Sequence, residues 1–354
     1  FFKQKTAYEM CGRDWSSDVC SSDLYKNDFR APIHPESIQK YNSNLFLDEG
    51  IFENLNYIFP NEENVTKIKN FNELDIVACV DFIEESKLKE LKDGAVLIGL
   101  FDFEKIEEIK KLRPEIKVLS FFKLPRISRA QNLDALSSQA NLLGYASVLR
   151  AANATENVIP MMTTAAGNIQ PSKVLILGVG VAGLQAIATA KRLGARVWAF
   201  DIRSEAKDQV ESLGAKFVEA SAVKQETVYA QEVSDEENQK IQEALKNQIL
   251  QSDIVLTFAQ IPGKKAPVLI EKSTVENMKK NSVIIDLAAG SGGNCEGTKV
   301  NEVVEINGVK IVGETDILKT VKHAATKLYS ENVRNLIELY LENSNDEIFV
   351  EMSS

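Results

Sequence analysis

The chain has 354 residues, 44% of them hydrophobic, and a formal net charge of −10 at pH 7. This length predicts about two domains, and the composition is typical of a globular protein in water. The acidic balance disfavours nucleic acid as a partner, because phosphate binding needs a basic face. The longest apolar run, residues 173–190, contains three glycines and a glutamine. It therefore predicts a strand, a turn and a helix, and we expect no membrane span.

The first 24 residues differ from the rest of the chain, since they follow neither a helical nor a strand period. They resemble a translated sequencing-adapter read, so we expect residues 1–24 to be a non-native leader outside the fold. A native but disordered leader is the alternative; an apolar core long enough for a signal peptide is missing. The remaining cysteines, Cys79 and Cys295, have no disulfide or metal-site spacing, so we expect no metal and a reducing compartment.

Residues 29–124 alternate short apolar runs with charged helical stretches. Strands are predicted at 74–82, 95–101 and 116–122, and helices at 84–94 and 102–115. This βαβαβ order predicts a parallel sheet, because parallel neighbours need a crossover connection. A long helix is predicted over 132–154, with Asn132 as its N-cap.

A second unit begins at Lys173 and repeats the strand–helix alternation. Strands are predicted at 173–178, 195–201, 215–220, 252–258, 281–288 and 308–314, and helices at 181–194 and 204–215. A helical tail, 323–341, is a candidate to return to the first unit. The predicted fold class is α/β, with two Rossmann-like doubly wound domains.

A long acidic segment, residues 221–247, separates two of the predicted strands. It can be a solvated surface helix with a loop. It can equally be a mobile flap over a binding site, with Tyr229 as its aromatic contact. The sequence leaves both interpretations open.

The sequence "GVGVAG" places Gly178, Gly180 and Gly183 at the G-x-G-x-x-G spacing, after a strand and at the start of a helix. The first glycine permits the turn, the second lets a pyrophosphate approach the backbone, and the third lets helix and strand pack closely. Asp201 ends the next strand, where a carboxylate accepts ribose hydroxyls and repels a 2′-phosphate. The motif therefore predicts NAD(H), although Arg203 could accommodate that phosphate. A purely structural glycine turn is the alternative.

The segment "PRISRAQNLDALSSQANLLGY", residues 125–145, gathers polar side chains without a histidine. Dehydrogenases of hydroxy or amino acids need an acid/base group, but His34 lies in a segment that predicts a loop or a helix start, and His323 opens the predicted tail helix, where we expect a surface histidine. Hydride exchange between two nicotinamide rings transfers no proton and depends on orientation. The cluster is therefore interpreted as a device that positions rings; an ordinary Arg–Asp pair capping a helix is the alternative.

The segment at 125–145, together with "MMTTAAGNIQPSKVLILGVGVAGLQAIATAKRLGA", "QIPGKKAPVLI" and "SVIIDLAAGSGGNC", resembles the NAD(H)-binding domain of proton-translocating NAD(P) transhydrogenase, alpha subunit. The resemblance runs from about Arg30 to the tail. It implies that the catalytic loop holds the nicotinamide through Arg126, Gln131, Asp134 and Ser137. It implies cofactor binding by Gly178, Gly180, Val181, Ala182, Gly183, Asp201, Arg203, Tyr229, Gln260, Pro262 and Gly263, beside a turn at Gly292–Gly293.

The resemblance also implies an activity and partners. The chain would bind NAD(H) and exchange hydride directly with NADP(H) on a partner domain, coupled to proton translocation by membrane subunits. It would be a homodimer, cytoplasmic and peripheral on the inner face of the plasma membrane. Its NAD(H) domain, 137–317, would be inserted into a first domain of residues 25–136 and 318–354. The family usually has a short strand ahead of "FRAPIHPE", which we expect the leader to have replaced.

Two alternatives remain. Alanine dehydrogenase, related in fold, needs a histidine after the strand "AVLIGL" and an aspartate near "LAAGSGG"; the chain has only Asp102 and Asp286 nearby. Arg30 could still match that enzyme's carboxylate-binding arginine. A non-catalytic NAD(H) sensor would keep the glycine turn and Asp201, but would have no reason to carry the polar cluster at 126–137.

Overall fold

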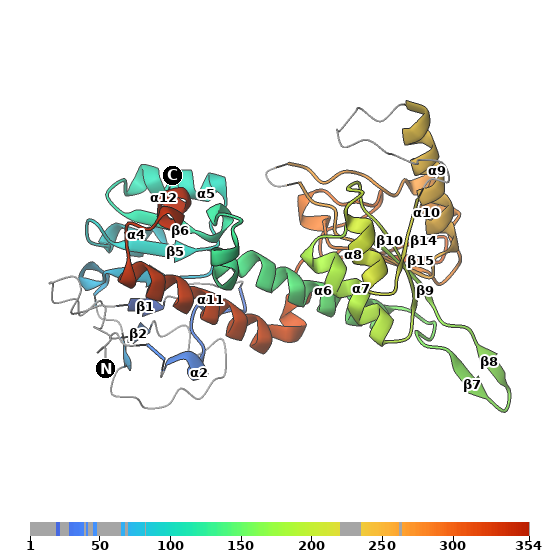
Figure 1. The fold of residues 1–354 in the computed structure, drawn as a ribbon, viewed down its shortest axis with the longest axis horizontal. Coiled ribbons are helices and arrows are strands. Elements are labelled where there is room, and N and C mark those ends of the chain that lie inside the picture. The colour runs from blue at the N-terminus through green and yellow to red at the C-terminus, as the bar shows by residue number, and fades with distance from the viewer. Residues whose placement is uncertain are drawn as a thin grey trace. The chain divides into compact units, whose positions relative to one another are not determined.

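The computed structural model describes residues 19–21, 28–38, 40–41, 45–47, 65–67, 70–81, 83–219, 235–261 and 264–353. The chain forms two compact units (Figure 1). Unit 1 comprises Phe1–Gln139 and Val321–Ser354, and unit 2 comprises Ala140–Thr320. The sequence-based division places the inserted domain at 137–317.

The described strands of unit 1 form a parallel sheet in the order β3-β2-β1-β4-β5-β6. The strands are β1 (Val19–Ser21), β2 (Leu45–Leu47), β3 (Val65–Lys67), β4 (Ile76–Ala78), β5 (Val96–Gly99) and β6 (Lys117–Ser120). The helices are α2 (Pro35–Ile38), α4 (Glu85–Glu90), α5 (Phe103–Leu112), α11 (Lys322–Glu342) and α12 (Glu347–Ser353), with 3-10 turns η1 (Phe71–Glu73), η2 (Phe121–Lys123) and η3 (Ser128–Leu133). The predicted βαβαβ order at 74–122 is confirmed, with shorter elements.

Strand β1 corrects one prediction, because it lies in the leader that we expected to stay outside the fold. Its backbone pairs with two neighbours, Val19 opposite both Leu45 and Ile76. Three residues are too few for a detectable period of two, and parallel pairing uses main-chain groups whatever the side chains are. Residues Val19–Ser21 thus contribute one strand to the sheet of unit 1.

Both faces of the unit 1 sheet are covered, as expected for a parallel sheet. Ile76 and Ile98 point to a core that contains residues of α11 and α12, whereas Val77 and Leu97 point to a core formed with α4 and α5. The return of the tail helix to the first unit is confirmed. Tyr329 of α11 is fully buried, and its hydroxyl donates to the Cys79 carbonyl at 2.6 Å.

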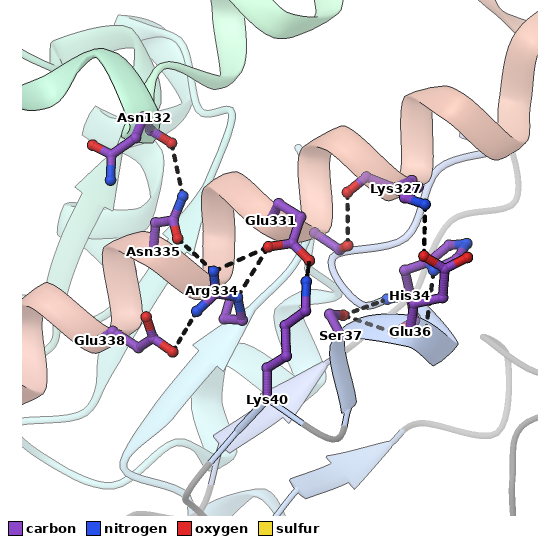
Figure 2. Close-up of polar contacts among 11 residues, drawn as sticks. His34, Glu36, Ser37, Lys40, Asn132, Lys327, Glu331, Arg334, Asn335 and Glu338 are labelled. Atoms are coloured by element: carbon purple, nitrogen blue, oxygen red, sulfur yellow. Dashed lines mark hydrogen bonds and ion pairs between the residues drawn. The ribbon is translucent and has the colours of Figure 1, made fainter.

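The polar side of α11 forms ion pairs with the segment that precedes β2 (Figure 2). Lys327 pairs with Glu36 at 2.6 Å, and Lys40 pairs with Glu331 at 2.6 Å. Nearby, His34 directly precedes α2, and its Nδ1 accepts the Glu36 amide at 3.2 Å. His34 therefore has the helix-start position that its sequence context predicts.

The main sheet of unit 2 has the strand order β11-β10-β9-β12-β13-β15-β14. The strands are β9 (Lys173–Leu177), β10 (Arg196–Phe200), β11 (Lys216–Phe217), β12 (Ile254–Thr257), β13 (Val283–Asp286), β14 (Val303–Ile306) and β15 (Val309–Val312). All pair in parallel except β14, which adds an antiparallel edge that the sequence did not predict. The helices are α7 (Val181–Arg192), α8 (Ala206–Ser212), α9 (Asp235–Gln251) and α10 (Lys272–Glu276). The order of the parallel strands is the doubly wound order that the sequence predicts.

A two-stranded hairpin, β7 (Met162–Thr164) and β8 (Gly167–Ile169), extends away from the main sheet of unit 2 (Figure 1). The sequence analysis missed it. All six strand residues are exposed, so the alternation of buried and exposed side chains that marks a strand is missing.

Candidate functional site

The sheet of unit 2 reverses its winding between β9 and β12, which are neighbours although far apart in sequence. Loops that follow adjacent strands diverge at such a switch point and leave a crevice for a nucleotide. Gly178 directly follows β9, and Phe258 directly follows β12. The glycine turn therefore lies at the carboxyl edge of the sheet, where the fold places a ligand.

The three motif glycines meet three different surroundings. Gly178 has a φ of 92°, and a Cβ there would lie 3.1 Å from the Ala259 amide nitrogen. A Cβ on Gly183 would lie 2.0 Å from the Gly178 carbonyl oxygen, so only glycine lets α7 pack against the turn. At Gly180 a Cβ would meet nothing within 4 Å. The protein itself leaves that position open, which fits a ligand approaching the backbone there.

Helix α7 begins directly after this open position. Gly180 is its N-cap residue and offers no side-chain cap to the first amides, which belong to Val181, Ala182 and Gly183. The first N–H groups of a helix lack partners within the helix and carry its partial positive charge. The residues present therefore fit a pyrophosphate group.

Gly144 is a site residue that the sequence analysis missed. It lies inside α6 (Ala135–Ala154), and a Cβ there would lie 2.1 Å from the Ala182 carbonyl oxygen. This close approach fixes the first turn of α7 against α6. The available signal was a glycine inside a predicted helix, where it costs about 1 kcal/mol relative to alanine and indicates close packing.

Asp201 follows β10 and is bonded to the glycine turn. Its Oδ2 accepts the Val179 amide at 2.7 Å, and its Oδ1 accepts the Arg203 amide at 3.0 Å and the Arg203 Nε at 2.9 Å. Burial acts to raise the pKa of Asp201, but the hydrogen bonds from Arg203 and Val179 outweigh it and the pKa is lowered. The group is therefore an ionised acceptor beside the turn, as a ribose-binding carboxylate must be.

Two further loops are joined to each other at this edge of the sheet. Gln260 donates to the Leu287 carbonyl at 2.9 Å. The Asn294 amide group donates to the carbonyls of Ala259 at 2.8 Å and Pro267 at 2.7 Å. Gln260 and the turn at Gly292 thus belong to one bonded network. Of the remaining predicted cofactor contacts, Tyr229, Pro262 and Gly263 lie outside the described residues.

Asp286, at the end of β13, organises the loop that follows it. Its side chain is fully buried and accepts bonds from Thr257, Thr298 and the amides of Ala288, Asn294 and Cys295. Burial and this carboxylate raise the pKa of the Cys295 thiol to about 12. Asp286 therefore has a structural role in this loop.

The polar loop at 126–137 belongs to unit 1, and its members are not equivalent. Arg129 donates two bonds to Asp346, at 2.9 and 2.8 Å, and thereby joins η3 to the start of α12. Arg126 and Gln131 are exposed, and within the described part of the chain neither side chain has a hydrogen-bond partner. Two polar side chains of this loop are thus available to a ligand.

The other two predicted loop residues bond to each other. Asp134 accepts the Ser137 amide at 2.9 Å and the Ser137 hydroxyl at 2.6 Å, so it caps α6. The prediction of Asn132 as the cap was wrong. The helix begins at Ala135, and the Asn132 carbonyl instead accepts the amide groups of two α11 residues, Asn332 and Asn335. Figure 2 shows the contact with Asn335. A helix cap is present, as the alternative interpretation held, but its partner is a serine and not an arginine.

A cavity of about 510 Å³ also lies in unit 1 and is lined by Arg30, Asp102 and Gln139, among others. Arg30 is engaged by Asp28, with Nη2–Oδ2 at 2.6 Å and Nε–Oδ1 at 3.0 Å. Asp102 caps α5 by accepting the Lys105 amide at 2.8 Å. Arg30 and Asp102 thus already have partners in the fold.

The described residues lack the marks of a membrane span and of a metal centre. They contain no helix that is both long and apolar enough to cross a membrane. Nor do three or more histidine, cysteine or acidic side chains gather anywhere in them as a metal site would require.

The switch point between β9 and β12, the glycine turn and Asp201 are the features of a dinucleotide-binding protein of the doubly wound class. The family model described as "Alanine dehydrogenase/PNT, C-terminal domain" matches residues 147–353. An NAD(P) transhydrogenase subunit alpha polypeptide from Rickettsia prowazekii is 39% identical over 94% of this chain and 93% of its own length. The chain belongs to the NAD(P) transhydrogenase alpha-subunit family.

Solved structures agree with this assignment. A transhydrogenase from Sinorhizobium meliloti superposes with a TM-score of 0.83 at 33% identity, over 95% of this chain and 97% of that one. An L-alanine dehydrogenase superposes with a TM-score of 0.75 at 18% identity, over 94% of both chains. The second likeness concerns the fold alone. The predicted fold class and family are confirmed.

Proposed function

We propose that this chain binds NAD(H) at the glycine turn and exchanges hydride directly with NADP(H) held by a partner domain. The observation that carries the proposal is the state of the polar loop. The side chains of Arg126 and Gln131 are exposed and have no hydrogen-bond partner among the described residues, and they precede the Asp134–Ser137 cap of α6. Because the fold uses neither side chain, both can bind a ligand without a loss of contacts within the protein.

The chemistry of such a loop suits hydride exchange. Bound nicotinamides supply the donor and acceptor carbons, and no proton needs to be transferred. What remains for the protein is to fix the carboxamide and ribose groups, and positioning of this kind is worth several orders of magnitude in rate. Neither histidine is required, and His34 accepts a backbone amide at the start of α2.

The proposed partner subunits rest on the membership of the chain in the transhydrogenase alpha-subunit family. The Rickettsia relative is named as a portion of a subunit, and we propose that this chain likewise works with NADP(H)-binding and membrane subunits that translocate protons. It would then be peripheral on the cytoplasmic face of the membrane that holds them.

The test is reconstitution. Purified chain is mixed with a transhydrogenase NADP(H)-binding domain, and NADPH-dependent reduction of an NAD⁺ analogue is followed. Turnover that requires both proteins supports the proposal. Tight NADH binding without turnover would favour an NAD(H) sensor. Oxidation of NADH with pyruvate and ammonium, without the partner, would favour an amino-acid oxidoreductase built around the Arg30 cavity.

Asp201→Ala is expected to weaken NADH binding about tenfold or more and to narrow the preference over NADPH, because it removes charge-assisted bonds to the ribose. The ratio of the two Kd values is the measurement, since it does not depend on how much protein is folded. Asp208→Ala, an exposed change of equal charge on α8, is the control. An unchanged ratio in Asp201→Ala would place selectivity elsewhere.

The homodimer is proposed to use the β7–β8 hairpin. Its two strands pair only with each other among the described elements, and Met161, Met162 and Ile169 are exposed. An extended hairpin with apolar side chains and open edges is suited to contact a second copy. Met162→Asp is expected to shift the protein from dimer to monomer by light scattering, whereas Val303→Asp on the edge strand β14 should not. Equal dimerisation of both variants would remove the hairpin from the interface.

A further inference from the structure

The carboxylate of Asp201 accepts four hydrogen bonds from within the protein. Its Oδ1 accepts the Arg203 amide at 3.0 Å and Arg203 Nε at 2.9 Å. Its Oδ2 accepts the Val179 amide at 2.7 Å and Arg203 Nη2 at 3.1 Å. Each carboxylate oxygen offers about two acceptor sites. A ribose diol therefore finds no vacant acceptor on this group.

The four hydrogen bonds to Asp201 differ in how readily a ligand can replace them. Two come from backbone amides, one of them in the glycine turn, and they persist as long as the turn does. The other two come from the Arg203 guanidinium, which is 59% exposed, whereas the Asp201 side chain beneath it is 8% exposed. The same guanidinium also donates to the Val179 carbonyl at 3.1 Å. The arginine thus covers the carboxylate from the solvent side.

Two hydroxyl donors of an adenosine ribose match the two donors that the guanidinium supplies. We propose that the Arg203 side chain is an internal occupant of the ribose-binding position, and that NAD(H) must displace it from Asp201 in order to bind. The inference rests on the proposed NAD(H) site and adds a specificity-determining residue to it. Arg203 accordingly opposes binding in this subsite, although it is a cation beside a site for an anionic ligand.

The proposal predicts that the affinity for ADP rises when Arg203 is replaced by alanine. Removal of a cation near a diphosphate would ordinarily weaken binding, because the long-range attraction is lost. If NAD(H) must displace the guanidinium, removal of Arg203 instead strengthens binding. Arg203→Ala should bind ADP about threefold more tightly, the size expected for release of an exposed ion pair. It should bind 2′,3′-dideoxy-ADP no more tightly than the unmodified protein does, because that ligand has no hydroxyls to replace the guanidinium.

The experiment is titration calorimetry of both ligands with the unmodified chain, Arg203→Ala, Arg192→Ala and Asp201→Ala. Arg192 is the matched control, since it is an exposed arginine in the last turn of α7, away from the glycine turn. The backbone amide of residue 203 is kept in the alanine variant, so the turn retains both amide bonds to Asp201.

Tighter binding of ADP alone in Arg203→Ala supports displacement. Weaker binding of ADP would overturn it and make Arg203 a direct ligand, and equal tightening of both ligands would also contradict it. Failure of the proposed site itself has a different signature. In that case ADP binds none of the four proteins, or its Kd for Asp201→Ala equals its Kd for the unmodified chain.

Discussion

Gly180→Ala is expected to leave the protein folded while raising the Kd for NADH about tenfold or more. A Cβ at this position meets no protein atom within 4 Å, and the φ of −83° suits alanine. The cost in stability is therefore about 1 kcal/mol or less, the difference between glycine and alanine as N-cap residues. The same Cβ occupies the space through which the pyrophosphate reaches the first amides of α7.

Gly183→Ala is the matched comparison, because it makes the same chemical change one turn further along. Its Cβ would lie 2.0 Å from the Gly178 carbonyl oxygen, so α7 must move away from the turn. Such overpacking costs about 1–3 kcal/mol of unfolding free energy. Urea unfolding and NADH titration of both variants separate the two roles. Equal losses of stability would contradict the assignment of Gly180 to the ligand.

Gln131→Ala is expected to lower hydride transfer to NADP⁺ on the partner by about a hundredfold, with little change in the Kd for NADH. The reason is geometric, since loss of alignment between reacting groups costs about this much in rate. The Gln131 side chain makes no hydrogen bond within the described part of the chain, and its backbone carbonyl, which accepts the Asp134 amide, is kept in the alanine variant. Single-turnover kinetics and fluorescence titration are the two measurements.

Asn132→Ala is the control for this prediction, because it deletes a neighbouring amide side chain on the same 3-10 turn. Among the described residues the Asn132 side chain has no hydrogen-bond partner, whereas its backbone carbonyl accepts from α11 (Figure 2) and is kept in the variant. Turnover in this variant should match that of the unmodified protein. If Gln131→Ala also turned over normally, the ring-positioning role would pass to Arg126 or to the Asp134–Ser137 pair.

Much of the fold follows from local pattern. The buried runs that became β9, β12 and β13 are long enough to identify as parallel strands, and the glycine spacing fixes the turn after β9. The G-x-G-x-x-G motif and Asp201 were also placed correctly relative to each other, because a strand and a helix of ordinary length separate them.

The missed features depend on contacts that a single segment does not encode. Strand β1 is too short to show a period, and β7–β8 has no buried face. Asp134 and not Asn132 caps α6, because η3 occupies the residues before it. Arg129 and Arg126 look alike in sequence, yet only Arg129 meets a carboxylate, at Asp346, more than two hundred residues away.

The measurement that tests the central claim most directly follows the transferred hydrogen. NADPH carrying deuterium at both C4 positions is mixed in ordinary water with this chain, the NADP(H)-binding domain and an NAD⁺ analogue. The account predicts that the reduced analogue carries about one deuterium per molecule, and that unlabelled NADPH in heavy water yields none, because direct transfer between rings involves no solvent proton. Deuterium lost to water, or gained from heavy water, would contradict direct hydride transfer.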